Sequence, residues 1–242
     1  MMGEDHGSSI PMTEIEEYLL ANDIEYWSSV MRGFENPPHI REWYGLINKV
    51  IFGGIKRLCV VAARDHAKSE VFAVSTTAWC SYYGEAAGIN WVYIFYNTQP
   101  QANDILDRIA EAIGQIYPEL LIGARRWERR DKIFSNGFRV TVRGAEASVR
   151  GAHPDLIIGD DVLSDSNSSS NATREKIKSW WRGTVSNMAK PTTGIILEGT
   201  VQHQLDLLWT LRENPTYIWK RYPAWKKVMI PKEVLEKRKV KS

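Results

Sequence analysis

The stretch that decides the fold is Val60-Val61-Ala62-Ala63-Arg64-Asp65-His66-Ala67-Lys68-Ser69. An apolar run from Leu58 to Ala63 predicts a buried strand, and after a short polar turn Lys68-Ser69 opens an apolar helical pattern. Strand, loop, Lys-Ser and helix follow one another in this order in a phosphate-binding loop. The helix N-terminus would offer N–H groups and a partial positive charge. Lys68 would add a cation for the β- and γ-phosphates, and Ser69 a hydroxyl for Mg²⁺.

The loop departs from the common pattern G-x-x-x-x-G-K-[ST], because Ala62 and Ala67 stand where glycines are usual. Taken alone, the stretch fits either a nucleotide site or a Lys-Ser pair at the exposed start of a helix. Positive φ is costly for alanine. We therefore expect both alanines at negative φ, or a loop that stays collapsed until a nucleotide opens it.

The composition, with 43% hydrophobic and 25% charged residues among 242, is that of an ordinary globular protein. No apolar run reaches the roughly 18 residues of a membrane span, and the N-terminus carries no export signal. Cys59 and Cys80 lie in apolar segments without metal-ligand spacing, which predicts buried thiols in a reducing, cytosolic environment. Residues 1–56 have a net charge of −5 and the remainder +7, which is compatible with a polyanionic partner.

From residue 57 onward, predicted strands alternate with predicted helices, the pattern of an α/β fold with a mostly parallel sheet. Asn136-Gly137 predicts one hairpin, between 132–134 and 138–142. Ser164 to Asn171 is predicted to be a mobile polar loop. The other predicted strands are 91–96, 154–162 and 194–197, and the predicted helices are 13–20, 23–31, 39–47, 69–83, 104–116, 173–188, 205–211 and 232–239.

Polar clusters follow three of the predicted strands: 64–69, Asp160-Asp161 and Glu198-Gly199-Thr200. Ligands bind at the carboxyl ends of parallel strands, so we expect one shared site. Asp160 suits a Mg²⁺ shell, Asp161 is placed to polarise water, and the Thr200 hydroxyl would sense the γ-phosphate. Two adjacent acids that end a buried strand also favour a nearby cation. The alternatives are turn or N-cap carboxylates for the two acids and a simple Gly-Thr turn for Thr200.

In this order the motifs resemble the ATPase domain of tailed-phage terminase large subunits, the motors that package viral DNA. The resemblance covers nearly the whole of residues 37–225. It rests on Pro38-His39-Ile40-Arg41-Glu42-Trp43, the loop 63–69 with Arg64 near its start, Asn97-Thr98, Arg150-Gly151, Asp160-Asp161, Thr173-Arg174-Glu175-Lys176 with Trp180, and Gly199-Thr200-x-x-His203-x-x-Asp206-Leu207-Leu208. The first of these is similar to the family's adenine-side segment and the last to its coupling motif.

The resemblance implies an α/β fold of the additional-strand, RecA-like P-loop NTPase type. That fold is a three-layer sandwich with a mostly parallel central sheet and a small C-terminal lid. It divides the chain into an N-terminal helical segment (1–36), an ATPase core (37–210) and a lid or linker segment (211–242). The family's nuclease domain has no counterpart here, because nothing after residue 225 offers its cluster of acids. We expect a truncated chain, or a natural short form, that does not cut DNA.

The resemblance also implies ATP hydrolysis with Mg²⁺ that drives double-stranded DNA into a procapsid without regard to sequence. The implied partners are the portal protein, the small terminase subunit and other copies of this chain. These copies would form a pentameric ring when docked, and the chain would be a monomer in solution, with no membrane partner. The implied location is the host cell cytoplasm and, transiently, the portal vertex of the procapsid.

The site implied by the resemblance has three groups of residues. A positive charge at the γ-phosphate would come from Arg64, or from Arg150 or Arg143 of a neighbouring subunit. Many family members have Asp-Glu where this chain has Asp160-Asp161, so water activation could belong elsewhere, with Glu198 as second choice. The predicted nucleotide-binding residues are His39, Trp43, Arg64, Asp65, His66, Ala67, Lys68, Ser69 and Glu70; the metal ligands are Ser69 and Asp160; and the catalytic residues are Lys68, Arg64, Arg150, Asp161 and Thr200.

Two other functions stay open. Another P-loop DNA translocase or helicase is the nearer one, although helicases carry Asp-Glu-x-[Asp/His] where this chain has Asp160-Asp161-Val162-Leu163. The other is a nucleotide-binding or DNA-binding module without turnover, favoured by the missing loop glycines and opposed by Lys68, Ser69 and Asp160. For DNA contact, the basic segment Arg125–Arg130 and the tail after Lys226 are candidates, gripping phosphates without reading bases.

Overall fold

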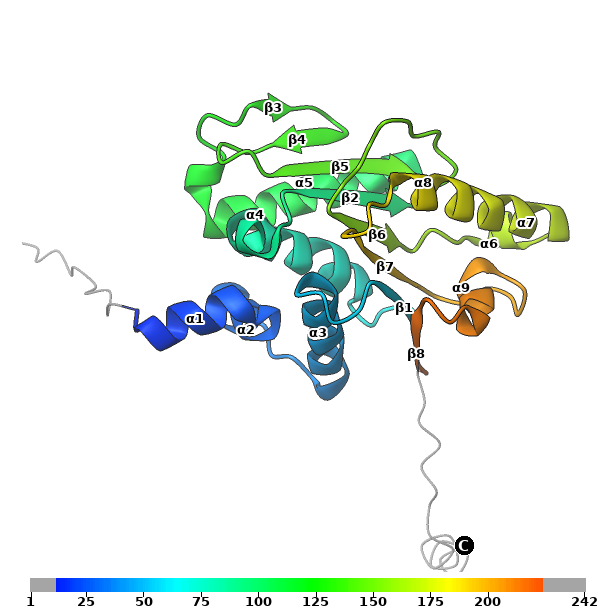
Figure 1. Cartoon of the computed structure of the whole chain (residues 1–242), viewed down its shortest axis with the longest axis horizontal. Coiled ribbons are helices and arrows are strands. Elements are labelled where there is room, and N and C mark those ends of the chain that lie inside the picture. The colour runs from blue at the N-terminus through cyan, green and yellow to red at the C-terminus, as the bar shows by residue number, and fades with distance from the viewer. Residues whose placement is uncertain (1–11, 224–242) are drawn as a thin grey trace, which may run out of the picture.

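The structure is a computed structural model that describes residues 12–223. Its strands form one eight-stranded sheet in the order β3-β4-β5-β2-β6-β7-β1-β8 (Figure 1). All neighbouring pairs are parallel except β3-β4 and β4-β5, which confirms the mostly parallel sheet. The strands are β1 (Arg57–Ala62), β2 (Trp91–Tyr96), β3 (Arg126–Trp127), β4 (Asp131–Ile133), β5 (Arg139–Gly144), β6 (Leu156–Asp160), β7 (Gly194–Gly199) and β8 (Ile218–Tyr222).

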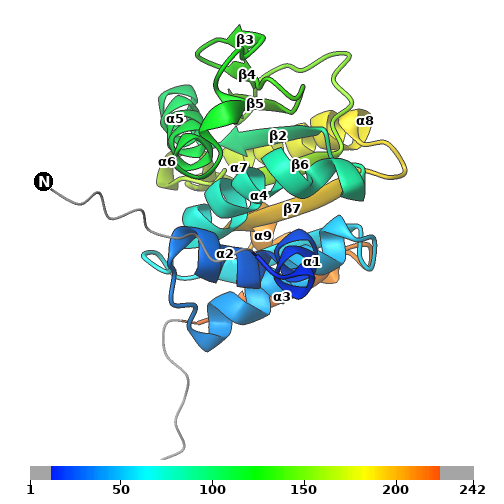
Figure 2. The same ribbon diagram turned by 90° about the vertical axis from the view of Figure 1, so that its left-hand side faces the viewer.

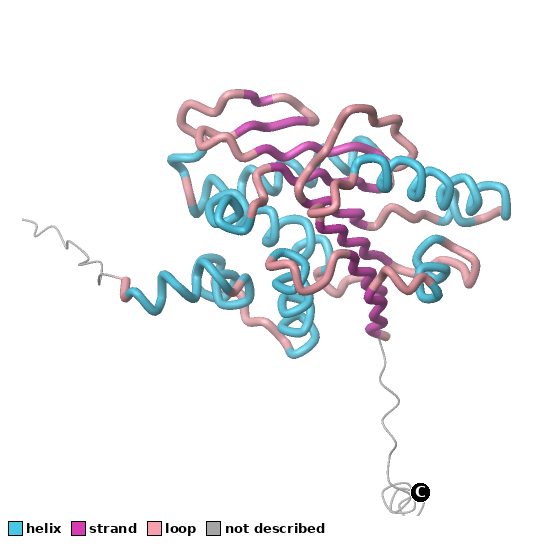
Figure 3. The backbone as a smooth tube through the Cα atoms, in the orientation of Figure 1, coloured by secondary structure: helices cyan, strands magenta, loops and turns pink. Residues whose placement is uncertain are grey.

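Helices cover both faces of this sheet, so the molecule has three layers (Figures 1 and 2). One layer holds α1 (Glu14–Asn22), α2 (Ile24–Arg32), α3 (Pro38–Ile51), the π-helical turn Glu70–Ser75 with α4 (Thr76–Tyr83), and α5 (Gln99–Ile116). The other holds α7 (Asn171–Trp180), which continues through a π-helical turn (Trp181–Val185) into α8 (Ser186–Met188), and α9 (Leu207–Thr210). Figure 3 shows the strands side by side between these helices.

Side-chain alternation along the strands gives the sheet two separate cores. On β2, Val92 and Ile94 are buried with the helices of the first layer, while Tyr93 and Phe95 are buried with Trp181 and the second layer. Residues of a strand point alternately to the two faces of its sheet, so an apolar run such as Trp91–Tyr96 can serve both cores. The continuous apolar character of the predicted strands is explained by this double coverage.

Several element boundaries differ from the prediction for local reasons. The fifth helix begins at Gln99 and not at Asp104, because the Thr98 side chain accepts a hydrogen bond from Gln101 N and caps it. The segment predicted as a polar loop contains the short helix α6 (Asp165–Ser168). Ser164 and Ser170 form capping boxes at the starts of α6 and α7, so these polar residues cap helices.

Strand β7 lies between β1 and β6, which is the additional strand of the predicted P-loop class. Strand β8 pairs with β1 on its other side, so residues 218–222 of the segment assigned to the lid extend the sheet. The rest of that segment, including the helix predicted at 232–239, lies outside the described residues. Within residues 12–223, none of the helices has the length and apolar character that crossing a bilayer requires.

Candidate nucleotide site

The three polar clusters meet at one edge of the sheet, as the sequence predicts. Strands β1, β7 and β6 are adjacent and parallel, so their carboxyl ends lie side by side. The register pairs Val61 with Gly199 and Asp160 with Glu198. The loop 63–69, the Gly199-Thr200 turn and the acid pair therefore share one corner of the molecule.

Lys68 connects the ends of β1 and β7. The residue is 8% exposed, and its Nζ donates to Ala63 O at 2.9 Å and to Thr200 Oγ1 at 3.4 Å. Thr200 Oγ1 in turn donates to Ala62 O at 3.1 Å. The ammonium group and the Thr200 hydroxyl are thus held together at the mouth of the loop, where they could meet the same phosphate.

Ser69 connects the loop to β6, since its Oγ donates to Asp160 Oδ1 at 2.8 Å. Asp160 is fully buried, and burial is the main cause that raises the pKa of its carboxyl, against hydrogen bonds from Glu198 and Ser69 that lower it. A hydroxyl and a carboxylate oxygen fit Mg²⁺, which takes few protein ligands and completes its shell with phosphates and water. Accordingly, no set of three or more His, Cys, Asp and Glu side chains in the described chain converges as an all-protein metal site.

Gly159, which precedes Asp160, allows the second core to pack tightly against β6. A Cβ at this position would lie 2.5 Å from Leu197 Cδ1 and 2.7 Å from the Trp181 ring. Any larger residue would push Trp181 or the neighbouring strand away. In the Gly159-Asp160-Asp161 sequence, the glycine is therefore explained by core packing, whereas the acids belong to the polar cluster at the strand ends.

Asp161 leaves the strand with a left-handed backbone, at φ 45°. Its N–H donates to Glu198 O at 3.2 Å, and its Oδ1 is buried without a hydrogen-bond partner in residues 12–223. Burial raises the pKa of the Asp161 carboxyl, and the nearby cations of Lys68 and Arg64 oppose that rise. Left-handed backbone costs a non-glycine residue of order 1 kcal/mol and is common at functional sites.

Glu198 belongs to a predicted polar cluster but lies within the strand and not after it, because the predicted strand stops at Leu197 whereas β7 runs to Gly199. The side chain is fully buried, and its carboxyl lies beside that of Asp160, to which the protonated form of Glu198 donates a hydrogen bond. Burial and the adjacent Asp160 carboxylate raise the pKa of Glu198 well above its ordinary value. The signal in the sequence was an acid directly after an apolar strand, one residue before the Gly-Thr turn.

The backbone of the phosphate loop contradicts part of the prediction. Ala67 has a φ of 57°, so the expectation of negative φ is wrong for this residue. Ala62 is the last residue of β1 and is not among the residues of positive φ. Ala67 O accepts from Val71 N at 3.0 Å, so the left-handed residue is the turn from which the helix begins. Asp65 adds a second left-handed residue at φ 62°.

A cavity of about 600 Å³ adjoins the loop on the side of the predicted adenine segment. His39 and His66 line it, with ring centroids 5.8 Å apart, and burial, then His66, lowers the pKa of His39. Trp43 is fully buried and packs its ring edge-on against His39 and Tyr222, so it supports the cavity from behind. The remaining lining comes from Pro38, Glu42 and Lys220–Pro223. The contribution of β8 was not predicted, because its residues are far from the loop in sequence.

Other predicted residues have different surroundings. The Glu70 carboxylate pairs with Arg32 and with Arg108, at 2.7 Å in the second case, so its side chain serves contacts to α2 and α5. Arg64 is exposed at the start of the loop. Arg143 and Arg150 line a separate groove over β2 and β5. In this chain they are not part of the cluster at the strand ends.

Asp206 has a structural role within the predicted coupling motif, residues 199–208. It is fully buried and accepts hydrogen bonds from Gln202 N, His203 N and Trp209 N at 2.8, 3.0 and 2.8 Å. The carboxylate thereby closes the turn after Thr200 and caps α9. The spacing between Thr200 and Asp206 is the spacing needed for this turn.

Strand order and loop position together define an additional-strand P-loop α/β fold. The scan against protein-family models and the search of curated proteins found no match for this chain. Among solved structures, a mutant of the large terminase ATPase domain of Thermus phage P74-26 matches with a TM-score of 0.50 and 16% identity, covering 88% of this chain and 91% of that one.

Two further matches are weaker. A second structure of the P74-26 domain gives a TM-score of 0.46 at 15% identity, covering 80% of this chain and 88% of that one. The large terminase of a thermophilic bacteriophage gives 0.45 at 7% identity, over 95% of this chain and 49% of that one. The chain thus has the fold of a phage large-terminase ATPase domain, and the expected resemblance is confirmed for the fold.

Proposed function

We propose that the chain binds ATP with Mg²⁺ at the three strand ends and hydrolyses it as the motor domain of a viral DNA-packaging terminase. The observation that carries this proposal is the 2.8 Å hydrogen bond from Ser69 Oγ to Asp160 Oδ1. It joins the first residues of the helix after the loop to an acid 91 positions away in sequence. These are the two oxygen donors that a nucleotide-bound Mg²⁺ needs in a P-loop site.

Each residue of the cluster has a role in binding. Lys68 would exchange its contacts to Ala63 O and Thr200 Oγ1 for oxygens of the β- and γ-phosphates. The N–H groups of the loop and of the helix start would add dipoles of the same sign. His39 and His66 would border the base, and Trp43 would hold His39 in place. Mg²⁺ held by Ser69 and Asp160 would neutralise charge on the phosphates.

Hydrolysis would proceed by attack of water on the γ-phosphorus. The new P–O bond forms as the bond to the β–γ bridging oxygen breaks, so ADP leaves with the negative charge. Asp161 would orient the water and accept its proton, which suits a partly buried carboxylate of raised pKa. Thr200 would contact the γ-phosphate, and Arg64, or Arg150 or Arg143 of a neighbouring copy, would stabilise the charge of the transition state.

The wider assignment follows from this proposal. The partners would be double-stranded DNA, the portal protein, the small terminase subunit and other copies of this chain in a pentameric ring. The work would take place in the host cytoplasm, at the portal vertex of the procapsid. Residues 37–210 together with β8 would be the ATPase core, with the helical segment before it and the lid or linker segment after β8.

Phosphate release tests the proposal. The chain is incubated with ATP and Mg²⁺, with and without double-stranded DNA, beside Lys68→Ala and Asp161→Asn. We expect turnover stimulated by the duplex, and a loss of about 10²-fold or more in either variant. Lys49→Ala, at an exposed lysine near the end of α3, is the matched control and should retain full activity. The isolated chain will be slow if the arginine comes from a neighbour, but its rate must still depend on Lys68.

Turnover that is equal in the parent and both variants would overturn the enzymatic half of the proposal. Stabilisation by ATP without any phosphate release would instead favour a nucleotide-binding module. Stimulation by single-stranded DNA but not by the duplex would favour the helicase alternative.

A further inference from the structure

A groove lined by arginines opens over β2 and β5, on the face of the sheet opposite α5. Its volume is about 310 Å³, and Arg139, Arg143 and Arg150 lie along it beside Trp91 and the loop 148–152. Arg139, Thr141 and Arg143 alternate along β5 with Val140 and Val142, which are buried in the first core. The strand therefore presents a polar, cationic face where the other central strands present apolar residues.

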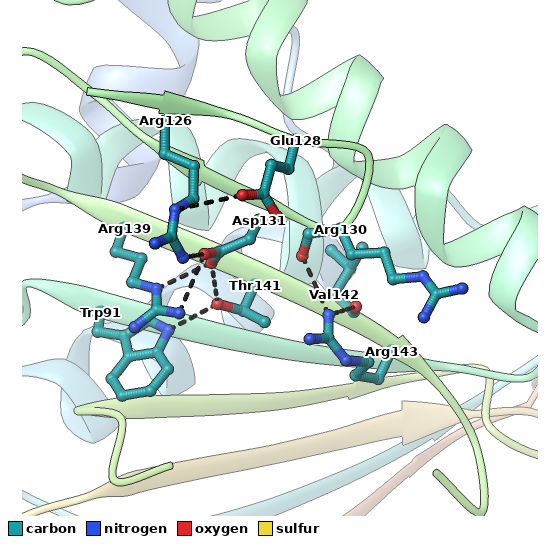
Figure 4. Close-up of polar contacts among 9 residues, drawn as sticks. All are labelled: Trp91, Arg126, Glu128, Arg130, Asp131, Arg139, Thr141, Val142 and Arg143. Carbon is teal, nitrogen blue, oxygen red and sulfur yellow. Dashed lines mark hydrogen bonds and ion pairs between the residues drawn. The ribbon is translucent and has the colours of Figure 1, made fainter. Parts of the chain in front are cut away.

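A buried carboxylate fixes the floor of this groove (Figure 4). Asp131 on β4 is 3% exposed and accepts from Arg139 Nε at 2.8 Å, Arg139 Nη2 at 3.0 Å and Arg126 Nη1 at 2.6 Å. Thr141 Oγ1 also donates to it at 2.6 Å and accepts from Trp91 Nε1 at 2.9 Å. The Arg139 guanidinium lies 4.2 Å from the centre of the Trp91 ring. Arg139 is thus held rigidly, with Nη1 left without a partner in residues 12–223.

The other two arginines keep most of their donors available. Arg143 uses only Nη1, which donates to Val142 O at 2.7 Å and to Arg130 O at 3.3 Å (Figure 4). Arg150 is exposed and makes no hydrogen bond or ion pair to the described part of the chain. Backbone carbonyls orient Arg143 without neutralising it. The groove therefore combines one fixed and two available guanidinium groups.

The charge of this region favours a polyanion. Residues 125–150 contain eight arginines and lysines and three acids, although the whole chain has a net charge of only +2. Arginine is suited to phosphate because its planar fork of donors matches two phosphate oxygens. A carboxylate partner on another protein would be matched equally well, but such an excess of cations over 26 positions is typical of a backbone-phosphate contact.

We propose that this groove binds the phosphodiester backbone of duplex DNA through Arg139, Arg143 and Arg150. The inference rests on the proposed DNA partner and moves its main contact from the segment 125–130 to β5 and the loop after it. It also withdraws Arg143 and Arg150 from the transition state and leaves Arg64 as the source of positive charge at the γ-phosphate. Arg139 and Arg143 are four residues apart on one strand, about 13 Å, so they contact different phosphates. Contacts to phosphate oxygens carry no sequence information, so we expect binding that is blind to sequence.

Salt-dependent binding of a labelled duplex, measured by fluorescence anisotropy without nucleotide, tests the groove. Each of Arg143→Ala and Arg150→Ala should reduce the slope of log K against log salt concentration by about 1, the loss of one phosphate contact. Arg143→Lys should retain more of the slope than Arg143→Ala. The matched control is Arg212→Ala, at an exposed arginine beside α9 that stacks over Trp209, and it should keep the parent slope.

Crosslinking gives a second measurement that does not depend on removing an arginine. The two native cysteines are buried, so a photoreactive group can be attached to Ser148→Cys at the exposed rim of the groove. We expect crosslinks to the duplex from this position and none from Gln115→Cys, which is exposed on α5 beneath the opposite face.

The outcomes separate the groove from the wider function. A parent that binds duplex with a salt slope unchanged in both alanine variants, and without crosslinks from position 148, overturns the groove but leaves the DNA partner intact. If the salt slope is unchanged, crosslinks are absent and the alanine variants lose turnover, the arginines act on a neighbour's nucleotide, and the proposal that the groove binds DNA is also wrong. A parent that binds ATP but no duplex overturns both the groove and the proposed DNA partner.

Discussion

Glu198 is the penultimate residue of β7, one position before Gly199, and its fully buried carboxyl meets that of Asp160 across the strand pair. A carboxylate in such surroundings favours its neutral form, because a charge there would lose its hydration and face another acid. The site is therefore built from three acids and one buried lysine, Lys68. With Glu198 neutral, Asp160 and Asp161 still outnumber this one lysine, so a divalent cation beside them would offset the remaining negative charge.

Replacing Glu198 tests this environment. The pKa of Glu198 is raised in the folded chain, so between the unfolded and folded pKa values the folded state binds a proton that the unfolded state has lost. Stability must then fall as pH rises above about 4.5. Glu198→Gln keeps the size and removes the titration.

We therefore expect this variant to gain stability over the parent as pH rises from about 5 to about 8, measured by urea unfolding with chelator present. A stability difference that stays the same across this range would show that Glu198 is ionised in the folded chain. Asp23→Asn, at an acid that caps α2, controls for a general effect of losing one carboxylate.

At the scale of elements, the phosphate loop shows what the sequence could not predict. The order of strand, loop, Lys-Ser and helix is correct, but the left-handed φ of Ala67 was not expected, because alanine rarely adopts it. Ala62 and Ala67 occupy the two glycine positions of the common pattern, yet only Ala67 has a backbone that favours glycine. The two substitutions should therefore act in opposite directions.

Ala67→Gly should stabilise the chain by about 0.5 kcal/mol, since relief of about 1–2 kcal/mol of left-handed strain exceeds the entropy that glycine adds to the unfolded state. Ala62→Gly should destabilise it by about 1 kcal/mol, because glycine weakens a strand interior. Chemical denaturation of the parent and both variants measures these two changes in the free energy of unfolding. Equal destabilisation by both glycines would contradict the described loop conformation.

The stability of the β4-β5 hairpin depends on the charge of the buried Asp131 carboxylate. Burial alone would raise the pKa of this carboxyl, but hydrogen bonds from Arg139, Thr141 and Arg126 outweigh it and lower the pKa. Its stabilising effect is thus complete above the ordinary pKa of 3.8 and is lost as pH falls through the lower folded value.

Asp131→Asn should destabilise the chain by about 2–4 kcal/mol at neutral pH, because it leaves arginines beside a buried neutral group. It should also weaken the fall in stability below about pH 4. Both effects are measured by denaturation at neutral and acidic pH. A neutral-pH stability equal to that of the parent would show that the network contributes little.

At the scale of the molecule, the hydrophobic periodicity and the polar residues at strand ends were sufficient to predict the sheet and its mostly parallel character. They also predicted that Lys68, Asp160 and Thr200 lie close together. They were sufficient because parallel strands must end at one edge. What the sequence did not reveal depends on contacts between distant segments. Tyr222 reaches the cavity beside His39 only because β8 pairs with β1, and Arg139 becomes fixed only because β4 brings Asp131 beside it.

The central claim is that the ends of β1, β6 and β7 form a single nucleotide site. The most direct test is to measure the binding of ATP with Mg²⁺ by thermal shift and calorimetry, in the parent and in three variants. Each variant changes one residue at one strand end: Lys68→Ala, Asp160→Asn and Thr200→Val. We expect the parent to gain about 2.7 kcal/mol of stability at a nucleotide concentration of 100 Kd. Each variant should bind about tenfold more weakly or worse, and Asp160→Asn should lose the dependence on Mg²⁺. ATP binding that is unchanged in all three variants would contradict the claim.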